Sequence, residues 1–146
     1  MRIVSLLRND DVKIYSVVLR MGIAGMRVDN ASSGGVDCGV TENGMLQAVA
    51  HSKTNGECYQ KHPTSGIKFE GYIIPSYDKV IETVKYMHPQ IPHFRLVSWD
   101  FTIDEKGDPI FIEANLNCGG LHINQINNGP LFGEDTKQIL DEVFGK

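Results

Sequence analysis

The chain has no surplus of positive charge and no long apolar run. Its 14 Lys and Arg residues are outnumbered by 18 Asp and Glu, which gives a formal net charge of −4. No basic cluster interrupts this balance, so the sequence disfavours binding to a nucleic-acid backbone. No window approaches the roughly 20 apolar residues that cross a bilayer, and the first residues are too short an apolar stretch for a signal peptide. These absences predict a cytoplasmic protein without a membrane span.

Cysteine is scarce and has no framework spacing. The three residues Cys38, Cys58 and Cys118 are an odd number, which fits reduced thiols rather than a disulfide scaffold. Cys58 and Cys118 are each followed four residues later by a histidine, His62 and His122, a spacing that raises the question of zinc. No paired C-x₂-C motif supports a zinc site, so zinc is the weaker interpretation.

What is present is an ordinary globular composition, with 41% hydrophobic and 22% charged residues. The length predicts one domain over residues 1–146, large enough to bury a core. We find no internal repeat and no linker.

The hydrophobic patterns predict more strands than helices. Apolar and β-branched segments predict strands near residues 3–7, 12–19, 36–41, 45–51, 94–103 and 109–115. Apolar residues at helical spacing predict helices over residues 77–87 and about 135–144. Consecutive strands are joined by short turns, which favours hairpins. We therefore predict an α+β fold in which an antiparallel sheet has its helices packed on one face.

The last two predicted strands carry polar residues on one face. Strict alternation predicts that the core side holds Val97, Trp99, Phe101, Ile103, Ile110, Ile112 and Ala114. The opposite side then holds Ser98, Asp100, Thr102, Phe111, Glu113 and Asn115. A four-residue turn at residues 105–108 would place Asp100 opposite Glu113, and Ser98 opposite Asn115.

Two carboxylates directly opposed on a sheet repel each other unless positive charge lies between them. Neither strand supplies that charge on this face, but a divalent cation would. Asp100, Glu113 and Asn115 offer hard oxygen ligands suited to Mg²⁺, which usually completes its shell with water and substrate phosphate. The alternative is that both carboxylates are solvated on an exposed sheet face.

The segments Val97-Ser98-Trp99-Asp100 and Ile112-Glu113-Ala114-Asn115 resemble the metal-binding end of the ATP-grasp ligases. By that resemblance Asp100, Glu113 and Asn115 hold the Mg²⁺ that bridges the phosphates of ATP. With His62-Pro63, Gly119-Gly120 and Gln125, the chain looks closest to the sugar-transfer-associated ATP-grasp subgroup.

The resemblance also covers the N-terminal part of the chain. It implies that Arg2, Arg20 and Arg27, together with Asn30, approach the γ-phosphate and the acyl-phosphate. It also implies nucleotide binding by the segment that contains Ser32, Ser33, Gly34 and Gly35. From the residues alone, the arginines could be surface residues. Arg20 shares strand parity with Ile14, Ser16 and Val18, which favours a phosphate role. The Ser-Gly segment could be a turn or an anion-binding nest.

The family reaction activates a carboxylate as an acyl-phosphate with Mg²⁺ and ATP, and an amine or similar nucleophile then displaces phosphate. The subgroup implies a sugar- or exopolysaccharide-related setting and a small-molecule or sugar-linked substrate. The chain corresponds to the C-terminal core segment of such a ligase, so we expect the N-terminal domain and the lid to be absent. The alternative is an incomplete half that binds a nucleotide, a metal or a partner without turnover. Self-association, or docking to the other domains, is expected in either case.

Overall fold

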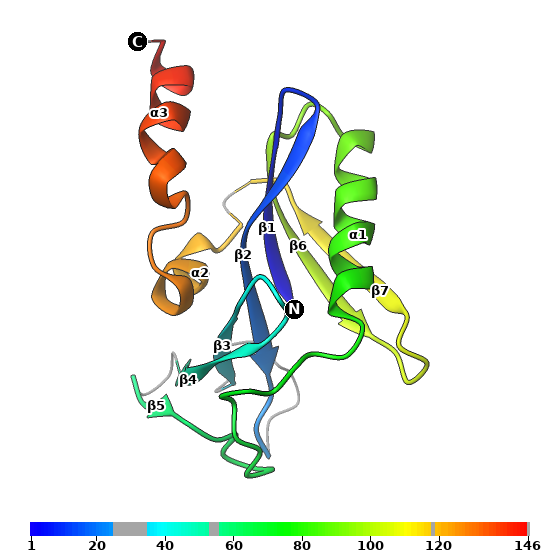
Figure 1. Cartoon of the computed structure of the whole chain (residues 1–146), viewed down its shortest axis with the longest axis vertical. Helices are drawn as coiled ribbons and strands as arrows, with labels where there is room; N and C mark the ends of the chain where they lie inside the picture. Colours follow the sequence, from blue (N-terminus) through cyan, green and yellow to red (C-terminus); the bar gives the residue numbers. More distant parts are fainter. Residues whose placement is uncertain (25–34, 53–55, 118, 146) are drawn as a thin grey trace.

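The computed structural model describes residues 1–24, 35–52, 56–117 and 119–145. Within these residues the strands form one antiparallel sheet in the order β5-β4-β3-β2-β1-β6-β7 (Figure 1). The strands are β1 (Arg2–Arg8), β2 (Asp11–Met21), β3 (Val36–Val40), β4 (Leu46–Ser52), β5 (Cys58–Tyr59), β6 (Leu96–Ile103) and β7 (Pro109–Asn115). The first strand of the chain therefore lies in the middle of the sheet, between β2 and β6.

The α-helices among the described residues are α1 (Tyr77–Met87), α2 (Leu121–Asn128) and α3 (Thr136–Phe144). Short 3-10 turns, η2 (His88–Gln90) and η3 (Gly133–Asp135), follow α1 and precede α3. The predicted α+β class with an antiparallel sheet is confirmed. The bounds of α1 are the predicted ones and α3 begins one residue later than expected, whereas α2 was not predicted from the sequence.

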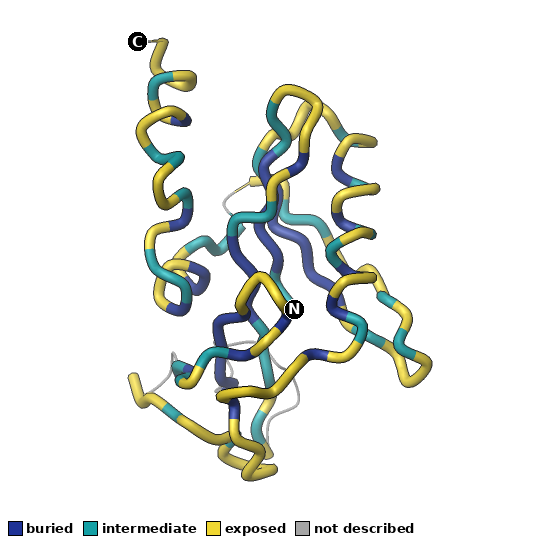
Figure 2. Tube along the Cα trace, viewed as in Figure 1, coloured by how far each residue is buried: buried dark blue, intermediate teal, exposed yellow. Residues whose placement is uncertain are grey.

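The helices divide between the two faces of the sheet instead of sharing one (Figure 1). Helix α1 buries Val80 and Val84 in the hydrophobic core together with Val17 of β2. Helix α2 packs on the other face, where Asn124 accepts a hydrogen bond from Ser16 at 2.9 Å. Ser16 and Val17 are consecutive in β2, so their side chains point to opposite faces. Figure 2 shows that the central strands are buried between these two layers.

The turn between β6 and β7 is tighter than predicted. The Asp104 N–H donates to the Asp108 carbonyl at 3.0 Å, which leaves a three-residue loop. Gly107 adopts φ 84°, the left-handed conformation that such loops require and that glycine accepts without strain. This turn shifts the pairing by one residue relative to the four-residue turn expected from the sequence.

A β-bulge in the β6–β7 pair restores the predicted pairing beyond it. The observed pairs are Thr102↔Ile110, Phe101↔Phe111 and Asp100↔Glu113. Ile112 is thus the extra residue, and it is 57% exposed. Phe111 lies on the α1 side, where its ring centroid is 6.3 Å from that of Trp99. The predictions that Phe111 shares a face with Glu113, and that Ile110 and Ile112 face the core, are wrong because a bulge interrupts strict alternation.

A polar network is buried where α1 ends. The Trp99 Nε1–H donates to Ser5 Oγ at 2.7 Å, and Ser5 Oγ lies 2.7 Å from His88 Nδ1. His88 Nε2 lies 2.9 Å from the Phe94 carbonyl, which can only accept. Nε2 therefore carries the proton and Nδ1 accepts from Ser5. Burial lowers the pKa of His88, so the neutral ring is favoured.

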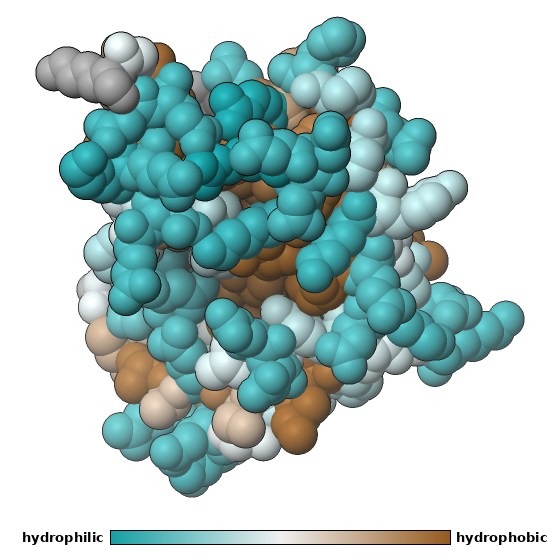
Figure 3. Space-filling model, turned by 45° about the horizontal axis from the view of Figure 1, so that its top comes forward, coloured by the Kyte–Doolittle hydropathy of each residue, from teal (hydrophilic) through white to brown (hydrophobic). Residues whose placement is uncertain are grey.

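Hydrophilic side chains cover most of the face drawn in Figure 3, and apolar side chains gather in a hollow near its centre. No helix among the described residues is long and apolar enough to cross a membrane.

Candidate functional site

The two carboxylates of the predicted metal site face each other across β6 and β7. Asp100 pairs with Glu113, and Ser98 pairs with Asn115, which confirms the predicted register. Glu113 and Asn115 are two residues apart in β7, and the Asn115 amide donates to Glu113 Oε1 at 3.1 Å. Because the Asn115 Nδ2 makes this bond, the side-chain oxygen Oδ1 of Asn115 is left as an acceptor beside the two carboxylates.

The positive charge between the carboxylates comes from neighbouring strands. Arg2 pairs with Asp100 in the β1–β6 ladder. Its Nε donates to Asp100 Oδ1 at 3.0 Å and its Nη2 donates to Oδ2 at 2.7 Å. The same Nη2 lies 3.9 Å from Glu113 Oε1. Arg20 of β2 adds a contact from Nη1 to Asp100 Oδ2 at 3.4 Å. The pairing of β1 and β2 with the rest of the sheet brings in this charge, which the residues of β6 and β7 alone do not reveal.

This cluster is covered on the Asp100 side and open on the Glu113 side. Side-chain exposure is 14% for Arg2, 10% for Asp100 and 11% for Arg20, against 56% for Glu113. The hydrogen bond to Asp100 raises the pKa of Arg2 and outweighs the effect of burial, which lowers it. Such a bidentate, poorly hydrated pair is far more constrained than an ion pair on the surface.

Arg20 reaches Asp100 because of its strand parity. Ser16, Val18 and Arg20 share the α2 face of β2, as predicted. An irregularity in the β1–β2 pairing skips one residue before Ser16, so Ile14 packs with the core on the α1 side. The prediction that Ile14 shares the face of Arg20 is therefore wrong.

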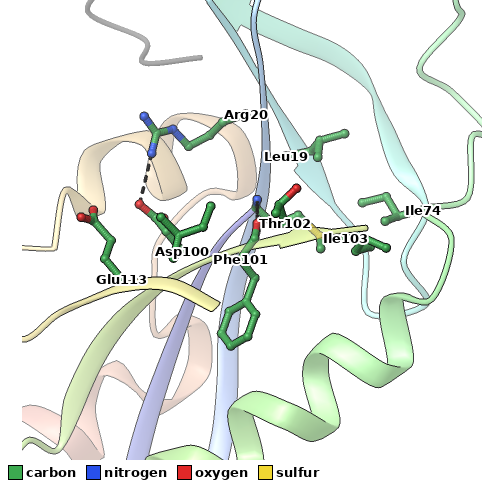
Figure 4. Close-up of a pocket in the computed structure, with 10 residues that line it drawn as sticks. Leu19, Arg20, Ile74, Asp100, Phe101, Thr102, Ile103 and Glu113 are labelled. Atoms are coloured by element: carbon green, nitrogen blue, oxygen red, sulfur yellow. Dashed lines mark hydrogen bonds and ion pairs between the residues drawn. The ribbon is translucent and has the colours of Figure 1, made fainter. Parts of the chain in front are cut away.

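A pocket of about 600 Å³ opens beside the cluster. Arg20, Asp100 and Glu113 lie at one end of it (Figure 4). Leu19, Ile74 and Ile103 line the other part (Figure 4). The pocket thus joins a charged end to an apolar end, a combination suited to a ligand that has both kinds of group.

A glycine pair closes the polar face next to Arg2. A Cβ on Gly119 would lie 2.2 Å from Ser98 Oγ, and one on Gly120 would lie 2.7 Å from Arg2 Nη1. Gly120 also has φ 67°. The backbone after Asn115 can therefore pass directly over the site only because these residues have no side chain. Gly119 and Gly120 belong to the residues that carry the sequence resemblance, but the sequence did not indicate that they lie beside Arg2 and Ser98.

The protein supplies only part of the oxygen ligands that a hard cation needs. Two carboxylates and one amide oxygen are ligands that Mg²⁺ accepts, and its remaining positions are usually filled by water or phosphate. Among the described residues, no three His, Cys, Asp or Glu side chains come together as a metal site. A zinc site at Cys58 and His62 therefore gains no support, and Cys118 lies outside the described residues.

Five of the predicted phosphate-binding residues also lie outside the described part of the chain. They are Arg27, Asn30, Ser32, Ser33 and Gly34. Gly35 is buried and directly precedes β3. The roles of this segment stay predictions.

The polar face extends to residues that the sequence reasoning did not single out. Asp37 lies opposite Arg20 in the β2–β3 pair, is 2% exposed, and helps to raise the pKa of Arg2. His51 lies opposite Asp37, and its Nδ1 is 3.0 Å from Asn127 Oδ1. The sequence signal that could have identified Asp37 is the presence of an acidic residue inside the otherwise apolar segment of residues 36–40.

The fold brings paired carboxylates and two arginines together on one face of an antiparallel sheet. The family model described as sugar-transfer associated ATP-grasp matches residues 1–140, so the chain belongs to that family. No curated protein matches the chain, and no solved structure does. Family membership supports a ligase-like role of the ATP-grasp kind, with ATP binding, in sugar-related processes.

Proposed function

We propose that the chain is the core segment of an ATP-dependent ligase that activates a carboxylate and joins it to an amine or similar nucleophile. The setting would be sugar- or exopolysaccharide-related metabolism. The observation that carries this proposal is the convergence of Arg20, Asp100 and Glu113 at one end of a pocket whose other part is apolar, with Arg2 paired to Asp100.

A nucleoside triphosphate matches that division of the pocket. Its phosphates suit the charged end, because a guanidinium fork binds phosphate oxygens in two-point contacts. Its base suits the aliphatic end formed by Leu19, Ile74 and Ile103. A volume of about 600 Å³ lies within the range of ordinary ligand sites.

The residues would divide the work by charge. Asp100, Glu113 and Asn115 would hold Mg²⁺, which when bound neutralises charge on the phosphates. Arg20 and Arg2 would orient the γ-phosphate and stabilise the charge that spreads over its oxygens. Phosphoryl transfer depends mostly on such positioning, so no nucleophilic side chain is required.

The chemistry would take two steps. An oxygen of the substrate carboxylate forms a bond to the γ-phosphorus, and the bond from that phosphorus to ADP breaks. An amine or similar nucleophile then bonds to the acyl carbon, inorganic phosphate leaves, and the nucleophile loses its proton.

A second candidate function is binding without turnover. The observation in its favour is that both oxygens of Asp100 already accept hydrogen bonds from Arg2. Trapping with hydroxylamine separates the two candidates, because an enzyme incubated with ATP and its carboxylate substrate yields a hydroxamate and ADP. A binding module yields neither.

The first test is a calorimetric titration with Mg²⁺ and a non-hydrolysable ATP analogue. We expect saturable, Mg²⁺-dependent binding to the wild type that is lost in Glu113→Gln. The control is Glu134→Gln in η3, an exposed glutamate away from the site, which should bind like the wild type. Equal binding by Glu113→Gln, or no binding by any of the three proteins, would overturn the proposed site.

A further inference from the structure

The carboxylate that the proposed function assigns to a cation is already bound by two arginines. Asp100 Oδ1 accepts from Arg2 Nε at 3.0 Å, and Oδ2 accepts from Arg2 Nη2 at 2.7 Å. Arg20 Nη1 lies 3.4 Å from the same Oδ2. In this arrangement the guanidinium of Arg2 occupies the position of a cation between Asp100 and Glu113. Its Nη2 lies 3.9 Å from Glu113 Oε1.

Most of the charge in this cluster cancels. Arg2 and Arg20 contribute two positive charges, against the negative charges of Asp100, Glu113 and the buried Asp37 opposite Arg20. A free divalent cation would therefore meet only a small excess of negative charge, and it would have to break a bidentate pair of which each side chain is at most 14% exposed. A polyphosphate anion changes this balance because it offers both guanidinium groups an alternative partner.

We propose that Arg2 makes cation binding conditional on a polyphosphate anion. Without the anion, Arg2 holds Asp100 and the site rejects free divalent cations. With the anion, Arg2 and Arg20 bind phosphate oxygens, and Asp100 and Glu113 become available to the metal. The site therefore takes up the nucleotide and its metal together. This inference rests on the proposed function, because it concerns the same residues.

The surroundings of Arg2 favour a side chain that exchanges between two partners, Asp100 and the phosphate oxygens of a ligand. Its Nη1 lies against Gly120, where a Cβ would be 2.7 Å away, so the backbone limits movement on that side. Its Nη2 already lies between Asp100 and Glu113. Glu113 is the exposed member of the cluster, so the direction toward Glu113 and the pocket is open for the exchange of partners.

Thermodynamic linkage makes the proposal measurable. If the anion raises the affinity for the metal, the metal must raise the affinity for the anion by the same factor. We expect a factor of about ten or more, within the usual range of coupling between sites. The probe is Mn²⁺, followed by the relaxation enhancement of water protons, with and without a non-hydrolysable ATP analogue.

Three proteins make the experiment specific. Wild type should bind Mn²⁺ about tenfold more tightly with the analogue than without it. Arg2→Gln should bind Mn²⁺ alone more tightly than the wild type does, with little further gain from the analogue. Arg95→Gln is the matched control, because Arg95 pairs with Glu142 away from the site, and it should behave like the wild type.

The outcomes separate this inference from the proposed function. Equal Mn²⁺ affinity with and without the analogue in wild type would overturn the inference and, by linkage, the metal-dependent nucleotide binding expected of the proposed function. An Arg2→Gln protein that gains no affinity for Mn²⁺ alone would overturn the inference and leave the metal–nucleotide site standing. If Arg2→Gln binds Mn²⁺ but neither protein binds the analogue, the ligase proposal fails and the blocking role of Arg2 stands. No Mn²⁺ binding in any protein under any condition would overturn both.

A measurement on the unaltered protein covers the case in which Arg2→Gln fails to fold. The Nε–H resonance of Arg2, assigned with Arg2→Lys, reports on its bond to Asp100 by NMR. The resonance should move when the analogue is added without metal, and should stay in place when Mg²⁺ is added without the analogue. A shift with Mg²⁺ alone would contradict the proposal, as would no shift with the analogue.

Discussion

Under α1 the sheet buries Val17, Val97 and Trp99, whereas under α2 it buries Ser16, Ser98 and Asp100. These residues are neighbours in the same strands, so one sequence builds an apolar layer and a polar layer back to back. The α1 face is held by packing, with one polar network at its end. The α2 face also buries Val4 and Val18, but it adds hydrogen bonds and ion pairs that link β1, β2, β6 and α2.

This difference indicates a division of labour between stability and chemistry. Apolar side chains are stabilised by burial alone, whereas buried polar groups must each find partners. A face built from polar groups is therefore specific in geometry, and its groups can exchange partners when a charged ligand arrives. The following predictions test whether the two faces differ in this way.

The largest effect on stability is expected from the α1 face. Trp99→Ala removes a side chain that is 2% exposed and should cost about 3–5 kcal/mol of unfolding free energy. Urea denaturation followed by circular dichroism measures the change. The control is Tyr86→Ala on the outer side of α1, 75% exposed, which should stay within about 0.5 kcal/mol. Similar costs for both variants would contradict an α1 face held by packing.

A smaller but mixed effect is expected from Asp100→Asn on the α2 face. The change removes a carboxylate that contacts two mostly buried arginines, at a cost of about 2–3 kcal/mol, and it should abolish Mg²⁺-dependent nucleotide binding. Denaturation and calorimetry on the same protein measure both. Asp141→Asn, which removes an exposed pair with Lys137, is the control and should cost no more than about 0.5 kcal/mol. A stable Asp100→Asn protein with normal nucleotide binding would refute the special role of this face.

The docking of α2 can be tested through one glycine of β3. A Cβ on Gly39 would lie 2.3 Å from Asn128 Oδ1 and 2.7 Å from Gln47 Nε2, so Gly39→Ala should cost about 1–3 kcal/mol by overpacking. In an Asn128→Ala background the same change should cost less, because the tighter of these two contacts is gone and only the one with Gln47 remains. A double-mutant cycle of unfolding free energies measures the coupling. Additive costs would indicate that α2 does not press on β3.

The smallest expected effect is the pH dependence from His88 on the α1 face. Burial lowers the pKa of folded His88 below its ordinary value of 6.5, so the unfolded chain binds the proton more readily. The contribution of His88 to stability is therefore complete above the unfolded pKa and is lost as the pH falls through the folded pKa. Urea midpoints between pH 7.5 and pH 5 should fall more steeply in wild type than in His88→Gln. Parallel profiles would show that His88 does not titrate on unfolding.

Much of the fold could be predicted because its signals are local. The β6 and β7 segments alternate well enough to predict a hairpin, and the apolar spacing in residues 77–87 specifies α1. Helix α2 lacked such a signal, since the residues it buries include Asn124 and Asn127. Their hydrogen bonds to Ser16 and His51 of the sheet add to the packing of Ile123, and no periodic pattern of apolar residues reports such bonds.

The sequence by itself determined the antiparallel hairpins and the helices α1 and α3, because alternation and helical spacing act over a few residues. Only the tertiary structure decided that β1 lies between β2 and β6. That placement brings Arg2, 98 residues away in the chain, onto Asp100. The bulge at Ile112 and the division of the helices between two faces were decided in the same way. Contacts at such separations depend on how whole strands and helices pack, which no local pattern encodes.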